Sequence, residues 1–300
     1  MKELIRQLFY FEETAGLAQN IVIVVSAALM VVLGIGCIIL SRWLVNTRFG
    51  AEALKDAPPR ENRLTPWPVL LIFLMWSFLT LAISEFAAFF MPGEPTPAEE
   101  LGGAVISSTI ASAFTVVCSL FLAKKVFANG LKGFGVTFDS KKALREEIGG
   151  LKMFLAIWPL TIIVYNAINL ICVMIMGEDF QMPRHDYLAS LSEDPSAWVL
   201  IAIFFSAVYV APVTEEIIFR GFLQTLLQKL TPSRWLSIFI TSVLFAMIHG
   251  GDMLLHWPTL IVLSMGIGYA YEKTGSMRYP VAIHAAFNFV NLVIAIMDIV

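Results

Sequence analysis

The run IVIVVSAALMVVLGIGCIIL, residues 21–40, decides the fold class of this chain. It carries no charged residue, and its length matches the roughly 20 apolar residues that a helix needs to cross a bilayer. The whole 300-residue chain is 58% hydrophobic and 14% charged, whereas a soluble chain carries about 25% charged residues. The composition therefore excludes a soluble enzyme, a disordered chain and a secreted disulfide scaffold.

Seven further apolar runs follow. Four have the length of a membrane span, at residues 67–84, 101–123, 153–176 and 198–214, and the last of these ends on Glu215 and Glu216. Three are weaker, at residues 235–248, 257–271 and 281–297. The first two of these fall short of a full span, so hydropathy alone gives six helices and leaves two in doubt.

The basic residues favour counting all eight runs. With eight spans, 17 of the 20 Lys and Arg residues fall in the connections after the odd-numbered spans, and only Lys2, Arg6 and Arg184 lie on the other side. Basic loops mark the cytoplasmic side of a membrane protein. We predict an all-α polytopic membrane protein, with about eight transmembrane helices enclosing a polar cavity and with cytoplasmic basic loops. Its partner is the lipid bilayer, and the net charge of −3 gives no indication of a nucleic-acid partner.

The chain divides into two regions. Residues 1–195 form an N-terminal membrane region with four helices, and residues 196–300 form a second region with four helices. Ionisable residues inside membrane spans are costly and by default mark function. They gather in the second region.

The first polar cluster is TEEIIFRG, residues 214–221. Glu216 and Arg220 are four positions apart with the acid first, which favours an ion pair on one helix face. Glu215 points about 100° away and has no local partner, so it is a candidate general base. The structural alternative for Glu216 and Arg220 is a helix end with solvated charges.

Two further clusters carry histidines. His249 follows Phe245 by one helical turn, and the Gly pair after His249 also fits a simple helix cap. His284 and Asn288 share one face of the last run, where they alternatively serve as hydrogen-bond links between helices. Straight spans would place Glu215 and His284 near the cytoplasmic helix ends and His249 deep in the membrane, so bringing them level requires a longer fifth helix or a short, tilted sixth.

In this order, EExxxR at Glu215–Arg220, FxxxH at Phe245–His249 and HxxxN at His284–Asn288 resemble the three motifs of the CAAX proteases and bacteriocin-processing enzymes, the CPBP family. This family includes the type II CAAX prenyl endopeptidases. The resemblance covers residues 198–293, about a third of the chain. It implies that residues 196–300 are the catalytic region of an intramembrane endopeptidase.

The resemblance also implies roles for the motif residues. Glu215 activates the attacking water, His249 positions or polarises it, and His284 and Asn288 donate hydrogen bonds to the oxyanion. Peptide hydrolysis needs such a base and such donors. Glu216, Arg220 and Phe245 are supporting residues.

The sequence leaves open whether this protease is metal-free or uses zinc. No HExxH motif is present, and we favour a metal-free glutamate mechanism. The alternative is a zinc metalloprotease with Glu215, His249 and His284 as ligands and an open position for water.

Two functions of other classes compete with proteolysis. One is a non-proteolytic membrane scaffold or immunity-type protein that keeps the motifs for structure. The other is a small transporter, which residues 21–176 disfavour because they hold no second copy of the Glu and His pattern. For a protease, the expected substrate is a membrane-associated peptide or protein, with a prenylated CAAX-like C-terminus as one candidate.

Overall fold

The structure, a computed structural model, describes residues 17–90, 97–183, 197–249 and 251–297. Within these ranges the regular elements are helices, and the β-pairing is confined to an isolated bridge between Asn62 and Phe127. The predicted all-α class is confirmed. The helices in chain order are α2 (Leu17–Asn46), α3 (Pro66–Phe90), α4 (Pro97–Val126), α5 (Gly130–Phe134), α6 (Ser140–Met176), α8 (Ala197–Phe205), η2 (Ser206–Val210), α9 (Ala211–Glu216), η3 (Ile217–Gln224), α10 (Thr225–Leu230), α11 (Arg234–Ile248), η4 (Gly251–His256), α12 (Trp257–Thr274) and α13 (Arg278–Met297).

Five of the helices in the described ranges are long and apolar enough to cross a membrane, and the protein is a multi-pass membrane protein. These spans are Val22–Asn46, Pro66–Phe89, Glu100–Val126, Ser140–Met176 and Trp198–Leu230. The predicted count of eight is not confirmed. The 15 residues of α11 extend only about 22 Å, which is less than the roughly 30 Å of the hydrocarbon core.

The fifth span is longer than its apolar run. The prediction that it ends at Thr214 is wrong, because α8, η2, α9, η3 and α10 continue one another as a single helix to Leu230. Most polar side chains of its second half are buried against neighbouring helices. A prediction that ends a span at the first charged residues therefore missed this half. Glu215 consequently lies 15 residues before Leu230, and His249 lies 15 residues after Arg234, where the next helix begins. Because Glu215 and His249 are the same number of residues from the turn between α10 and α11, they lie at the same depth in the bundle.

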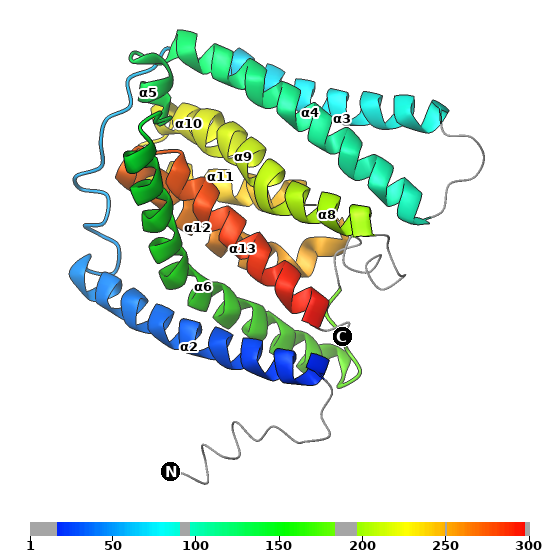
Figure 1. Cartoon of the computed structure of the whole chain (residues 1–300). Helices are drawn as coiled ribbons and strands as arrows, with labels where there is room; N and C mark the ends of the chain where they lie inside the picture. Colours follow the sequence, from blue (N-terminus) through cyan, green and yellow to red (C-terminus); the bar gives the residue numbers. More distant parts are fainter. Residues whose placement is uncertain (1–16, 91–96, 184–196, 250, 298–300) are drawn as a thin grey trace.

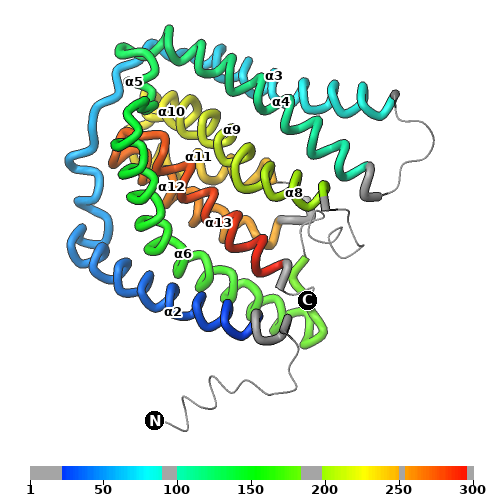
Figure 2. Tube along the Cα trace, viewed as in Figure 1, coloured from blue at the N-terminus to red at the C-terminus, as the bar shows by residue number. Residues whose placement is uncertain are grey.

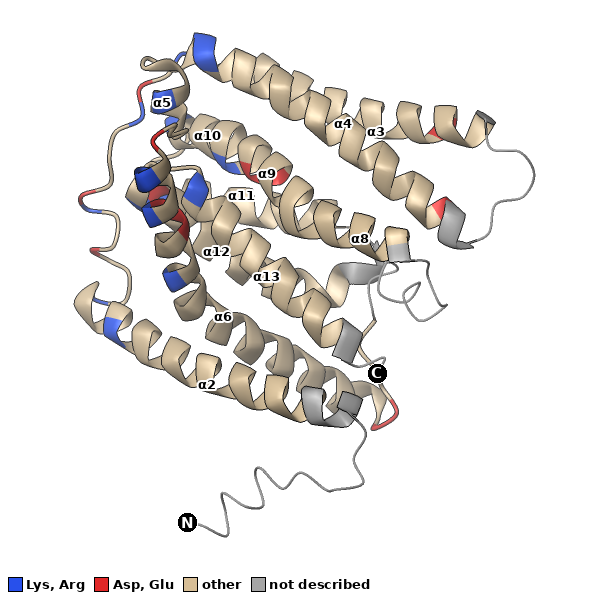
Figure 3. Ribbon diagram, in the orientation of Figure 1, with Lys and Arg blue, Asp and Glu red and all other residues tan. Residues whose placement is uncertain are grey.

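The spans lie side by side, with α3 and α4 on one side of α8–α10, and α6 and α2 on the other (Figure 1). Lys and Arg gather at the end of the bundle where α4 ends and α6 begins (Figure 3), which we call the basic end. Arg220 is an exception, because it is buried inside η3 instead of lying in a loop. Lys2, Arg6 and Arg184 lie outside the described residues.

Helix α6 starts at the basic end and bends along its length (Figure 2). Its start is set by Asp139, whose carboxylate accepts from the backbone N–H groups of Lys141 and Lys142. These bonds, led by that of Lys142, hold the pKa of Asp139 below its ordinary value. The bend has a cause in Pro159, which lacks the N–H that would bond the carbonyl of Leu155.

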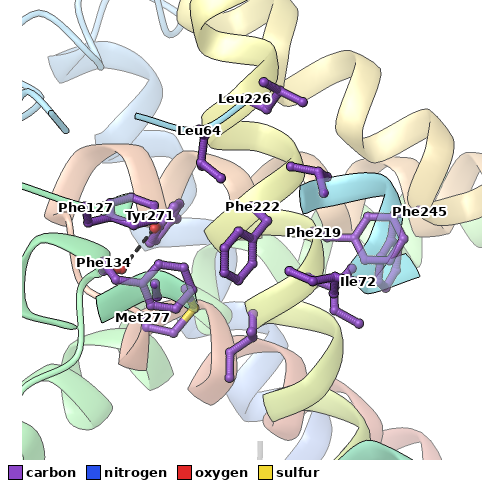
Figure 4. Close-up of a cluster of buried hydrophobic side chains, with 14 residues drawn as sticks. Leu64, Ile72, Phe127, Phe134, Phe219, Phe222, Leu226, Phe245, Tyr271 and Met277 are labelled. Carbon is purple, nitrogen blue, oxygen red and sulfur yellow. Dashed lines mark hydrogen bonds between the residues drawn. The ribbon is translucent and has the colours of Figure 1, made fainter. Parts of the chain in front are cut away.

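A core of aromatic and aliphatic side chains fills the space near the basic end. Phe134, Phe222 and Tyr271 come from three separate helices and pack together (Figure 4), with the Tyr271 hydroxyl donating to the carbonyl of Phe134 at 3.0 Å. The same cluster extends to Phe219 and Phe245 (Figure 4). This core joins the fifth span to α11 and α12 and fixes their relative positions.

The α2–α6 contact generates a stability prediction. At Gly36 an added Cβ would lie 2.0 Å from the carbonyl oxygen of Leu155, whereas nothing lies within 4 Å of a Cβ at Gly34. Both substitutions to Ala raise helix propensity by about 1 kcal/mol. We expect Gly36→Ala to lower the thermal unfolding midpoint because overpacking costs roughly 1–3 kcal/mol, and Gly34→Ala to leave it equal or higher. Equal midpoints for the two variants in the same detergent would contradict this packing.

Candidate active site

The polar residues of the three motifs meet inside the bundle. Glu215 lies at the end of α9, His249 caps α11 and His284 lies in α13. The Glu215 Oε2 atom is 4.0 Å from His249 Nε2 and 3.8 Å from His284 Nε2. The side chains of Glu215, His249 and His284 are 13%, 25% and 5% exposed, so the group is nearly closed off.

The other nitrogen of each imidazole is engaged. His249 Nδ1 lies 2.8 Å from the carbonyl oxygen of Phe245, and His284 Nδ1 lies 2.7 Å from Glu216 Oε1. A carbonyl oxygen and a carboxylate only accept hydrogen bonds, so both Nδ1 atoms carry the proton and donate. Each imidazole therefore turns its Nε2 atom towards Glu215.

Glu216 pairs with Arg220 as the sequence predicts. Arg220 Nη1 donates to Glu216 Oε1 at 3.0 Å, and both side chains are fully buried. The alternative of a helix end with solvated charges is wrong. Arg220 Nη2 also donates to the hydroxyl and the backbone carbonyl of Ser264 in α12, at 2.7 and 3.2 Å.

Phe245 occupies the centre of the site. It is 1% exposed, and its ring centroid lies 4.6 Å from that of His249 and 5.7 Å from that of His284. The guanidinium of Arg220 lies 4.8 Å above the same ring, within the range of a cation–π contact. Phe245 thus fixes both imidazoles and the arginine by packing.

Asn288 lies one turn after His284 but makes a different contact. Its Nδ2 donates to the carbonyl of Ala207 at 2.7 Å. This carbonyl is free because the N–H of Ala211 bonds Ser206 in the π-helical turn η2, and the next residue, Pro212, has no N–H. Asn288 retains a second amide hydrogen.

Several residues around the site escaped the sequence analysis. Ser264 and Gly268 lie in helix α12, which forms a polar ladder with the fifth span. The rungs join Arg220 to Ser264, Gln224 to Gly268 and Gln228 to Glu272. The spacing of Arg220, Gln224 and Gln228 at every fourth position was visible in the sequence. Only the tertiary structure shows that this row of side chains faces α12.

The residues do not fit a zinc ion in this arrangement. Tetrahedral zinc ligands with bonds of about 2.0–2.1 Å lie about 3.3 Å from one another, and the separations from Glu215 to the two histidines are 4.0 and 3.8 Å. In the described part of the chain, no three His, Cys, Asp or Glu side chains are grouped closely enough to hold a metal.

Fold and site together define a helical multi-pass membrane protein with a buried carboxylate and histidine centre. Residues 196–290 match the family model described as type II CAAX prenyl endopeptidase Rce1-like. The match contains every motif residue from Glu215 to Asn288, and it confirms the resemblance inferred from the motifs. The matched family is a protease family.

A relative in Escherichia coli, an uncharacterized 24.3 kDa protein, is 26% identical over 120 residues. The alignment covers 39% of this chain and 55% of the relative, so the chain spans about half the length of the curated relative it matches. No solved structure matches the chain.

The buried ion pair generates a second prediction. Arg220→Met leaves the Glu216 charge buried without its guanidinium, and breaking such a pair costs roughly 3–5 kcal/mol. Arg48→Met removes the exposed pair with Glu52, and we expect a loss below about 1 kcal/mol. The free energy of unfolding in mixed micelles measures both, and similar losses would contradict the structural role of Arg220.

Proposed function

We propose that the protein is an intramembrane endopeptidase that hydrolyses a peptide bond of a membrane-associated substrate. The observation that carries the proposal is the convergence of His249 Nε2 and His284 Nε2 on the Glu215 carboxylate. The family match supports a peptide bond as the target.

A water molecule fits the centre of this group for a simple reason. In our proposal His249 is neutral, so its Nε2 atom and the Glu215 carboxylate are both acceptors and need a donor between them. A water at hydrogen-bond distance from Glu215 and His249 donates to both. Glu215 then accepts one proton as the water oxygen bonds the scissile carbonyl carbon, while His249 holds the water in line. Glu215 passes this proton to the leaving amine as the C–N bond breaks.

The oxyanion needs donors in the same place. In our proposal His284 is an imidazolium throughout the reaction, so it donates from Nε2 to the oxyanion while Glu216 accepts from its Nδ1. The second amide hydrogen of Asn288 is the other donor, because the first is held by Ala207. Donors that are fixed before the reaction stabilise the developing charge without reorganisation.

The mechanism we propose is the metal-free glutamate form. The wide spacing of Glu215, His249 and His284 supports it. For the substrate we propose a chain anchored at the cytoplasmic leaflet, with a prenylated CAAX-like C-terminus as one candidate. The accumulation of Lys and Arg at the basic end supports a cytoplasmic orientation of that end.

Glu215→Gln tests the base directly. The amide keeps the shape of the side chain but cannot accept the proton, so we expect cleavage of a farnesylated CAAX peptide to fall about 10²–10⁴-fold. The thermal unfolding midpoint should stay at or above that of the wild type, because the Oε2 atom of Glu215 has no direct hydrogen bond in the protein to lose. Initial rates with the full-length protein in detergent measure the effect.

The controls separate the remaining alternatives. Equal cleavage by wild type and Glu215→Gln contradicts the role of Glu215, and no cleavage of farnesylated, unmodified or transmembrane peptides by the wild type favours the scaffold function. Activity that disappears with a chelator and returns with added zinc contradicts the metal-free mechanism.

Asn288→Ala tests the oxyanion donor against a neighbour in the same helix. We expect kcat/KM to fall about 10²–10³-fold, as for the loss of one oxyanion donor. Asn291→Ala is the matched control, since Asn291 is exposed and its amide donates only to Phe287 of the same helix. A similar loss in both variants would assign the effect to helix packing.

A further inference from the structure

The first turns of α6 form a surface that the catalytic proposal does not use. Helix α6 has 37 residues and extends about 55 Å, against roughly 30 Å of hydrocarbon, so a substantial part of it lies outside the membrane interior. Its second half runs alongside α2, and its first half turns away from that direction at the basic end (Figure 2). The bend follows from Pro159.

The exposed side of this first half carries one line of apolar residues. Leu144, Ile148 and Leu151 are 58%, 43% and 47% exposed. Their spacing of four and three residues places them in a row on one helix face. Such side chains belong in a hydrocarbon-like surrounding, not in water.

A line of cations runs beside the apolar line. Lys141, Arg145 and Lys152 are exposed, and at 100° per residue they fall within about 60° of Ile148 on its other side. The acids of the segment point elsewhere: Glu146 pairs with Lys142 at 3.7 Å, and Glu147 pairs with Arg278 of α13. The exposed side of the first half of α6 is therefore both apolar and cationic.

We propose that this surface, the α6 interfacial face of Lys141, Leu144, Arg145, Ile148, Leu151 and Lys152, binds anionic phospholipid headgroups. The apolar line enters the acyl boundary, and the cationic line contacts the headgroup phosphates, as in helices that lie at a membrane interface. Charge complementarity and the adjacency of the bilayer to a multi-pass protein select lipid as the occupant. The inference does not depend on proteolysis.

Lipid selectivity tests the cationic line. The full-length protein is reconstituted in phosphatidylcholine with trace spin-labelled phosphatidylglycerol or phosphatidylcholine, and the immobilised fraction of each is measured. We expect the wild type to immobilise a larger fraction of phosphatidylglycerol than of phosphatidylcholine. In the variant with Lys141→Gln, Arg145→Gln and Lys152→Gln, the ratio of the two fractions should fall at least about twofold.

A charge-matched variant gives the control for this measurement. Arg48→Gln, Lys55→Gln and Lys125→Gln remove three exposed cations from other elements and should retain the preference. An equal loss in both variants, or no loss in either, overturns the proposal. So does a preference abolished by inorganic phosphate but not by chloride of the same ionic strength, because the surface would then bind free phosphate.

The depth of the apolar line gives an independent test. In a background without Cys37, Cys118 and Cys172, nitroxides at Leu144→Cys and Ile148→Cys should collide more with oxygen than with a water-soluble nickel chelate. Lys142→Cys, which lies towards the side of the helix, should show the reverse. Preferential access of the chelate to position 148 places the face in water, available to an acidic soluble partner, and overturns lipid binding.

Discussion

A single buried carboxylate oxygen links the helices of the candidate site. Glu216 Oε1 accepts from Arg220 at 3.0 Å and lies 2.7 Å from His284 Nδ1, and both Glu216 and Arg220 are fully buried. An ion in such a place costs several kcal/mol unless its partners are well placed. The need to satisfy Glu216 therefore ties the fifth span to α13, and through the second Arg220 bond to α12. The orientation of His284, and with it the approach of Nε2 to Glu215, depends on this link.

The fifth span meets these demands by departing from α-helical geometry. Two π-helical segments, η2 and η3, flank the short α9 that carries Glu215 and Glu216. In each segment a side chain donates to a backbone carbonyl: Asn288 donates to Ala207, and the Thr225 hydroxyl donates to Arg220 at 3.2 Å. Irregular backbone at membrane depth is tolerated where protein buries it, and π-turns frequently occur at functional sites.

Below the site, the ladder between the fifth span and α12 continues to a second buried carboxylate. Glu272 lies 3.3 Å from Arg60 and 3.6 Å from Arg234, and it accepts from Gln224 and Gln228 at 3.0 and 2.6 Å. Arg60 precedes α3, so this network fastens the connector between α2 and α3 to the second region. From Glu216 to Gln228 the polar side chains of the fifth span thus each have a polar partner, which helps to explain how a helix with so many polar side chains stays buried.

The sequence by itself determined the membrane class, the helical fold, the Glu216–Arg220 pair and the identity of the motif residues, because apolar run length and spacing along one helix are local properties. It misplaced the end of the fifth span, because a hydropathy scale scores Glu216, Arg220 and Gln224 as solvent-exposed and cannot register the partners that α12 and α13 supply to them. It left open whether His249 reaches Glu215, since that depends on two helices running equal distances from one turn. Only the tertiary structure decided which nitrogen of each histidine faces Glu215 and that Asn288 donates to the free carbonyl of Ala207. It also decided that Phe245 packs against His249, His284 and Arg220. These are contacts between residues far apart in the chain, and no local pattern encodes their distance or orientation.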